Sequence, residues 1–167
     1  LSITSILKYD LTQLLDLPIS SNMRLRLHTL IHRKPTDVWS VFQNPDNLML
    51  WQSNLKEVRN IEGKPSFPGN IRDLVYHEKG RELLKRERIR YRQEKVALDT
   101  VVTWPLAEMF IENRFLQAEG GTRWVLEANI RFRGFFWFGS LFLTANIQKQ
   151  ITAEMEKFRL LLEKRKS

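Results

Sequence analysis

The residue in this sequence best placed for acid–base chemistry is Glu87, in the stretch "RELLKRERIRYRQ" (81–93). The stretch alternates as a β-strand does, so Glu87 shares one face with Ile89 and Tyr91 while arginines occupy the other. Burial among apolar side chains would raise the pKa of this carboxyl group and suit it to proton transfer on an enolisable ligand. The favoured interpretation is a rim glutamate paired with a nearby Lys or Arg.

The three histidines do not complete a catalytic or metal site. His28 and His32 fall on the outer face of the first predicted strand, and His77 lies near a hairpin end. None has an evident Ser or Asp partner, the chain contains no cysteine, and no HExxH-like spacing occurs. We therefore predict no metal and no cofactor, with Glu87 as the one candidate catalytic residue.

A formal net charge of +8 suits an acidic partner. Four arginines share the outer face of 81–93: Arg86, Arg88, Arg90 and Arg92. This basic surface suits the phosphates of an anionic membrane or the ribosome. It lacks interleaved aromatic side chains, which argues against sequence-specific binding of nucleic acid. The alternative is a solvated basic surface without a partner.

The apolar stretch "GFFWFGSLFL" (134–143) is either an interfacial membrane anchor or the packed start of a helix. No apolar run reaches the ~20 residues that span a bilayer. With no cysteine and no signal segment, the expected location is cytoplasmic, at most peripheral to a membrane.

These residues lie on predicted strands and helices whose order indicates an α+β domain with an antiparallel sheet. A strand at 23–32 precedes two short helical segments in "RKPTDVWSVFQNPDNLMLW" (33–51), about six strands, and an amphipathic helix at about 136–164. Strands and helices do not alternate, so no parallel βαβ sheet is expected. We assign residues 1–22 to an N-terminal extension or leader and 23–167 to the domain.

These motifs, in this order, resemble the SRPBCC superfamily, which includes START domains, Bet v 1-like allergens and polyketide cyclases. The matching motifs are P-x-x-V-W-x-V-F at 35–42, NPDN at 44–47, Trp51, Pro68-Gly69 and Gly120-Gly121-Thr122. The resemblance implies the helix-grip fold, in which a curved antiparallel sheet of about seven strands surrounds the long C-terminal helix. The two short helices would cradle one end of that helix, and a cavity would lie between helix and sheet.

Side-chain alternation then predicts the cavity lining, unless a one-residue bulge reverses the faces of a strand. The predicted ligand-binding residues are Trp51, Tyr76, Tyr91, Leu98, Thr100, Trp104, Met109, Asn113, Phe115, Trp124, Phe138 and Phe142. Apolar walls with a few polar groups are typical of small-molecule pockets. The alternative is that these side chains simply fill the core.

The resulting prediction is binding or carriage of a hydrophobic small molecule, such as a lipid, a quinone or a polyketide-like compound. Tyr91 and Asn113 would orient its polar end, while the long helix and the Pro68-Gly69 loop gate entry. One alternative is a polyketide cyclase or dehydratase centred on Glu87. Another is a basic module that docks on the ribosome or an anionic membrane. The oligomeric state is not predicted.

Overall fold

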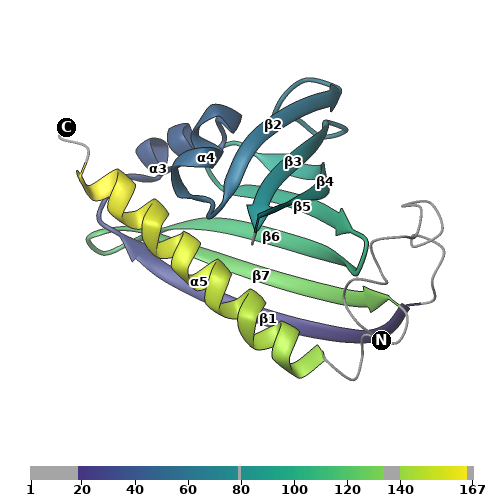
Figure 1. Ribbon diagram of the computed structural model, residues 1–167. Coiled ribbons are helices and arrows are strands. Elements are labelled where there is room, and N and C mark those ends of the chain that lie inside the picture. The colour runs from purple at the N-terminus through teal and green to yellow at the C-terminus, as the bar shows by residue number, and fades with distance from the viewer. Residues whose placement is uncertain (1–18, 79, 134–139, 165–167) are drawn as a thin grey trace.

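A curved antiparallel sheet carries one long helix across its concave side (Figure 1). The computed structural model describes residues 19–78, 80–133 and 140–164. The strands are β1 (Ile19–Ile31), β2 (Leu55–Glu62), β3 (Ile71–Glu78), β4 (Arg81–Gln93), β5 (Ala97–Trp104), β6 (Ala107–Ala118) and β7 (Gly121–Arg133). The helical elements are α3 (Pro35–Phe42), the 3-10 turn η1 (Pro45–Asn47), α4 (Leu48–Trp51) and α5 (Ser140–Lys164).

The strand order is β1-β7-β6-β5-β4-β3-β2, so the first strand pairs with the last and all other pairs are sequence neighbours. This arrangement confirms the predicted helix-grip fold. Strand β1 begins at Ile19, before the predicted start at Met23, because Ile19 and Asn22 pair with Arg133 and Arg131 of β7. Residues 1–18 of the predicted extension lie outside the described residues.

The two short helical segments form as the sequence predicts. Pro35 occupies the first turn of α3, where its missing N–H removes no helical hydrogen bond. Asn44 caps η1, and its side-chain oxygen accepts a hydrogen bond of 3.0 Å from the backbone N–H of Asp46. Helices this short are not stable alone, so tertiary packing must hold them.

That packing comes from a cluster of buried aromatic rings. The Phe158 ring of α5 is fully buried, and its centroid lies 5.6 Å from that of Phe42 and 5.3 Å from those of Trp51 and Trp124. Phe115 of β6 stacks on Trp124 at 6.0 Å. Edge-to-face and stacked contacts at these distances add to the free energy gained by burial. The cluster thus joins α3, α4, α5 and the sheet at one end of the domain.

The rest of α5 is positioned by its amphipathic pattern. Ile151, Met155, Phe158 and Leu162 recur at helical spacing and are buried against the sheet. The C-terminal end of α5 lies beside α3 and α4 (Figure 1). The short helices therefore support one end of the long helix, as predicted.

The turn between β6 and β7 requires glycine. Gly120 has a φ of +79° and Gly121 a φ of +153°. A Cβ atom on Gly121 would collide with the carbonyl oxygen of Ile31, at the end of β1. Glycine therefore permits both the turn and the close approach of β1 to β7.

Candidate ligand-binding site

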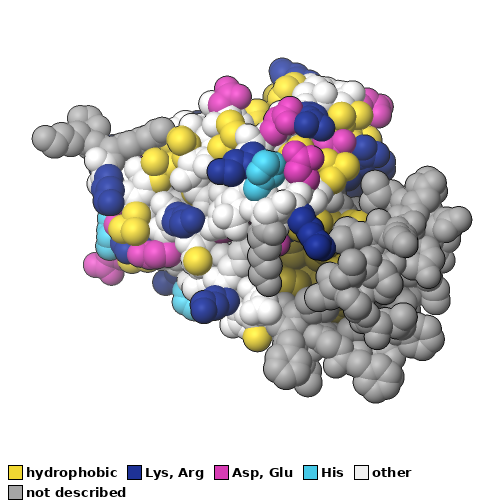
Figure 2. Space-filling view, in the orientation of Figure 1, with side chains coloured by type: hydrophobic (Ala, Val, Ile, Leu, Met, Phe, Trp, Pro, Cys, Tyr) yellow, Lys and Arg dark blue, Asp and Glu magenta, His cyan; other side chains and the backbone are white. Residues whose placement is uncertain are grey.

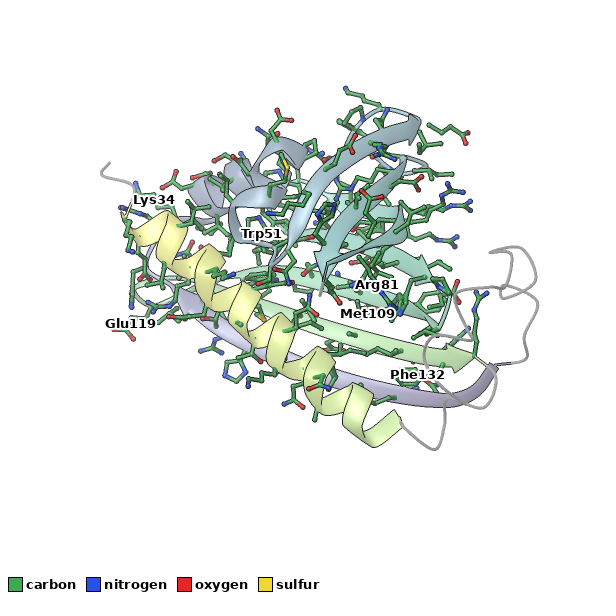
Figure 3. All side chains as sticks on the ribbon, in the orientation of Figure 1. Lys34, Trp51, Arg81, Met109, Glu119 and Phe132 are labelled. Atoms are coloured by element: carbon green, nitrogen blue, oxygen red, sulfur yellow. The ribbon has the colours of Figure 1, made fainter. Side chains whose placement is uncertain are left out.

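A cavity of about 120 Å³ lies between the sheet and α5. Trp51 on α4 and Met109 on β6, both labelled in Figure 3, lie in its wall. Figure 2 shows apolar side chains on the floor of a hollow beside the end of the β3–β4 hairpin. The volume is below the ~300–1,000 Å³ typical of ligand sites. A large ligand would therefore need α5 to move away from the sheet.

Most of the predicted lining residues face this cavity. They are Trp51, Tyr76, Leu98, Thr100, Trp104, Met109, Asn113 and Trp124. Phe115 packs instead in the aromatic cluster, against Trp39 and Phe42. Phe138 lies outside the described residues, and Phe142 belongs to α5 at a point where side chains are not described. The predicted gate at Pro68 and Gly69 contributes no lining residue.

Tyr91 does not line the cavity, contrary to the prediction. Its side chain is 47% exposed, and its hydroxyl group donates to Gln93. The register between β4 and β5 shifts between Ile89 and Tyr91. Such a bulge adds one residue to β4 and reverses the facing of the side chains that follow. Tyr91 therefore cannot orient a ligand inside the cavity.

The same bulge turns Arg92 inward, so its assignment to the basic surface was wrong. The Arg92 guanidinium lies 4.4 Å from the ring centroid of Phe67 and 5.2 Å from that of Trp39. It also donates to the backbone carbonyl of Ser66 at 2.9 Å. Arg92 therefore ties the loop before β3 to α3 through cation–π contacts and a hydrogen bond.

Asn113 faces the cavity but is already engaged by the protein. Its Oδ1 accepts a hydrogen bond of 3.0 Å from Trp124 Nε1, and its Nδ2 donates to the carbonyl of Leu98 at 3.0 Å. The side chain thus fixes the ring of Trp124 within the sheet. This use leaves Asn113 little capacity to orient a ligand.

Glu87 is paired, as the favoured interpretation held, but the pair is buried rather than at the rim. Arg72 of β3 lies directly opposite Glu87, and its Nε donates to Oε2 at 2.5 Å. Only 6% of the Arg72 side chain and 8% of the Glu87 side chain are exposed. The charge-assisted hydrogen bond engages the Glu87 carboxylate within the protein. Glu87 lines the cavity as a member of this buried ion pair, and a catalytic role for it stays a prediction.

The sequence reasoning missed several polar side chains in the cavity wall. They are Gln52, Arg72, Lys85, Gln150 and Glu154. For two of these residues, the sequence pattern does indicate a place in the cavity wall. Lys85 shares the face of Glu87 by alternation, and Glu154 adjoins the apolar stripe of α5 at Met155. The prediction named neither residue as part of the cavity lining.

Tyr76 and Lys85 form one side of this polar part of the cavity. The Tyr76 hydroxyl donates to Gln52 Oε1 at 2.6 Å, and burial raises the pKa of Tyr76 well above 10.0. The Lys85 ammonium lies 4.4 Å from the Tyr76 ring centroid and 5.5 Å from that of Trp104. Burial lowers the pKa of Lys85.

Glu154 of α5 is the other described carboxyl group in the wall besides Glu87, and it is partly buried. Its Oε1 accepts hydrogen bonds from the backbone N–H of Ser53 at 3.1 Å and from Gln150 Nε2 at 2.9 Å. Burial raises the pKa of Glu154, although these hydrogen bonds and the cations Lys85 and Lys157 partly offset the effect.

The free energy of unfolding of the Glu154→Gln variant is expected to increase relative to that of wild type as pH rises. Because the pKa of Glu154 is higher in the folded state, its ionisation costs stability between about pH 4.5 and the raised pKa. Urea unfolding at several pH values, from below 4.5 up to the raised pKa, measures the difference. Glu156→Gln is the control. Its effect on stability should change with pH in the opposite direction, since a hydrogen bond from Arg159 lowers the pKa of exposed Glu156. Parallel pH profiles for both variants would contradict the assignment.

Solved structures of low sequence identity share this fold. Ara h 8.0201 superposes with a TM-score of 0.73 at 10% identity, covering 85% of this chain and 98% of the other. The ZhuI aromatase/cyclase from Streptomyces sp. R1128 superposes with a TM-score of 0.73 at 15% identity, covering 87% of this chain and 96% of the other. The protein TTHA0849 from Thermus thermophilus superposes with a TM-score of 0.69 at 13% identity, covering 87% of this chain and 100% of the other. No curated protein sequence matches the chain significantly.

A sequence family described as polyketide cyclase/dehydrase and lipid transport matches residues 23–163. The chain belongs to this family. The match runs from β1 through almost all of α5, so the cavity lies entirely within the family's domain. Membership confirms the resemblance to the SRPBCC superfamily. It is consistent with binding of a hydrophobic ligand or with cyclase-like activity.

The convex face of this polyketide cyclase/dehydrase-family domain is less basic than predicted. Arg86 forms an ion pair with Asp73 at 2.8 Å, and Arg26 forms one with Glu127 at 3.2 Å. Arg88 and Arg90 are exposed, and neither has an ion pair with another described residue. Docking on an anionic membrane or the ribosome stays a prediction that rests chiefly on these two arginines.

Within the described part of this family domain, no three His, Cys, Asp or Glu side chains gather as metal ligands would. None of the described helices is long and apolar enough to cross a membrane.

Proposed function

We propose that this protein binds a small, largely apolar molecule in the cavity between the sheet and α5. The observation that carries the proposal is the cavity itself, with a volume of about 120 Å³. Protein cores are close-packed and leave few voids larger than a water molecule. A space of this size, walled by Leu98, Val102 and Ile111 among others, can hold a small apolar guest.

Binding or carriage fits the site better than turnover does. Arg72 holds Glu87, Trp124 and Leu98 engage Asn113, and the bulge removes Tyr91 from the wall. The candidate catalytic residue, Glu87, and the two residues predicted to orient a ligand are thus engaged by the protein or lie outside the cavity. Lipid transport, which stands beside cyclase activity in the description of the family, is the closer precedent.

A cavity-filling substitution tests the proposal. Ile111→Trp on β6 is expected to weaken binding of 1-octanol at least tenfold, because the larger side chain would occupy the space of the ligand. Isothermal titration calorimetry measures the affinity, and circular dichroism checks that the variant is folded. Leu116→Trp is the matched control, since Leu116 lies on the same strand but is 47% exposed. The proposal fails if wild type does not bind octanol, or if both variants bind it equally well.

A further inference from the structure

Lys85 is the cavity cation that lacks an anionic partner among the described residues. The other cation in the wall, Arg72, is matched by Glu87 at 2.5 Å. Lys85 contacts the faces of Tyr76 and Trp104, and its Nζ makes no hydrogen bond or ion pair with any residue in the described ranges. An ammonium group has three N–H donors, so its hydrogen-bonding capacity is unused by these residues.

This arrangement is unfavourable for the ligand-free protein. Lys85 is half-buried, and drawing an ammonium group partly out of water without a paired acceptor costs free energy. The two aromatic faces offset part of that cost through cation–π attraction. Glu78 and Glu154 act on Lys85 through longer-range attraction, but neither is within ion-pair distance of it. A ligand anion beside Lys85 would supply the missing contact.

The surroundings of Lys85 also define the rest of the ligand. Leu74 of β3 and Trp104 of β5 flank Lys85 from the two strands adjacent to β4, and the wall continues through Val102 and Met109. An anionic group at Lys85 would therefore be attached to an apolar body that extends along the sheet under α5. The volume of about 120 Å³ favours a short chain or a single ring.

We propose that Lys85 binds the carboxylate of the ligand, so that the cavity selects small apolar carboxylates over alcohols and amines of the same length. This inference rests on the proposed function, because it concerns the same cavity. Glu154 opposes the binding, since its carboxyl group lines the cavity and would repel a ligand carboxylate. Lys85 and Glu154 therefore affect ligand affinity in opposite directions.

Two variants and one control separate these contributions. Lys85→Met removes the charge but keeps an unbranched side chain that can pack on Tyr76 and Trp104. Glu154→Gln removes the like charge while its side-chain oxygen can still accept from Ser53. Lys56→Met, on an exposed position of β2, is the matched control for loss of one positive charge.

The experiment is calorimetric titration with octanoate, 1-octanol, octylamine and octyl phosphate. Wild type is expected to bind octanoate at least tenfold more tightly than octanol. Lys85→Met should abolish the preference for octanoate over octanol, and Glu154→Gln should increase octanoate affinity severalfold. Lys56→Met should bind all four compounds as wild type does. The melting temperature of Lys85→Met should not fall below that of wild type, whereas a purely structural role for Lys85 would lower it.

Equal octanoate affinity in wild type and Lys85→Met overturns the inference. Tighter binding of octylamine than of octanoate also overturns it, because the dominant charge would then be Glu154. Tighter binding of octyl phosphate than of octanoate overturns the choice of a carboxylate. If octanol does not bind at all, the proposed function itself fails. If octanol binds and octanoate binds no better, only the role of Lys85 is lost.

Discussion

Replacement of Phe158 by alanine is expected to lower the free energy of unfolding by about 3–5 kcal/mol, the range for removing a buried phenylalanine. The ring is fully buried and contacts Phe42 of α3, Trp51 of α4 and Trp124 of β7. Its loss leaves a cavity at the place where both short helices, the long helix and the sheet meet. The surrounding rings come from rigid elements, so they can collapse only partly into the space.

Chemical denaturation followed by fluorescence measures this change, because the tryptophans nearest Phe158 report on the same region. Leu160→Ala is the matched control, since Leu160 lies on the same helix and is 37% exposed. We expect its effect to be much smaller. Comparable losses in the two variants would contradict a special contribution of the aromatic cluster to the packing of α5.

The second large effect concerns the buried ion pair. Arg72→Met leaves the Glu87 carboxylate without its partner in a site where only 8% of its side chain is exposed. Breaking a buried pair from one side typically costs about 3–5 kcal/mol, because the remaining charge stays desolvated and uncompensated. Arg88→Met, on the same sheet but exposed, should change stability little.

The double variant Arg72→Met, Glu87→Met distinguishes a charge effect from a packing effect. Replacement of both partners by apolar side chains of similar length removes the uncompensated charge, so the double variant should be more stable than Arg72→Met alone. Urea unfolding of the wild type, both single variants and the double variant completes a thermodynamic cycle. Additive losses would mean that the two side chains stabilise the sheet independently of each other.

Local patterns in the sequence are sufficient for much of this fold. Proline at the first turns and Asn44 before Pro45 predict the two short helices, because capping depends only on neighbouring residues. Alternation in β5 predicts that Leu98 and Thr100 face the cavity, since that strand carries no register shift against β6. Where the backbone is regular, the side-chain period alone decides the face.

The incorrect predictions concern residues at which the backbone departs from the regular strand geometry, or whose partners are distant in the sequence. The bulge after Ile89 leaves no mark in the alternating residues of β4, yet it moves Tyr91 outward and Arg92 inward. A bulge is selected by how neighbouring strands twist and pair, so it is a property of the sheet rather than of one strand.

The sequence by itself determined the order of the elements, the capping of the short helices and the apolar stripe of α5, since each depends on contacts within a few residues. Only the tertiary structure decided the electrostatics of the cavity. Pairing of β3 with β4 places Arg72 against Glu87, whereas docking of α5 brings Glu154 to the cavity wall that also contains Lys85. Whether a buried charge is neutralised depends on which distant residue reaches it, and no local pattern records that.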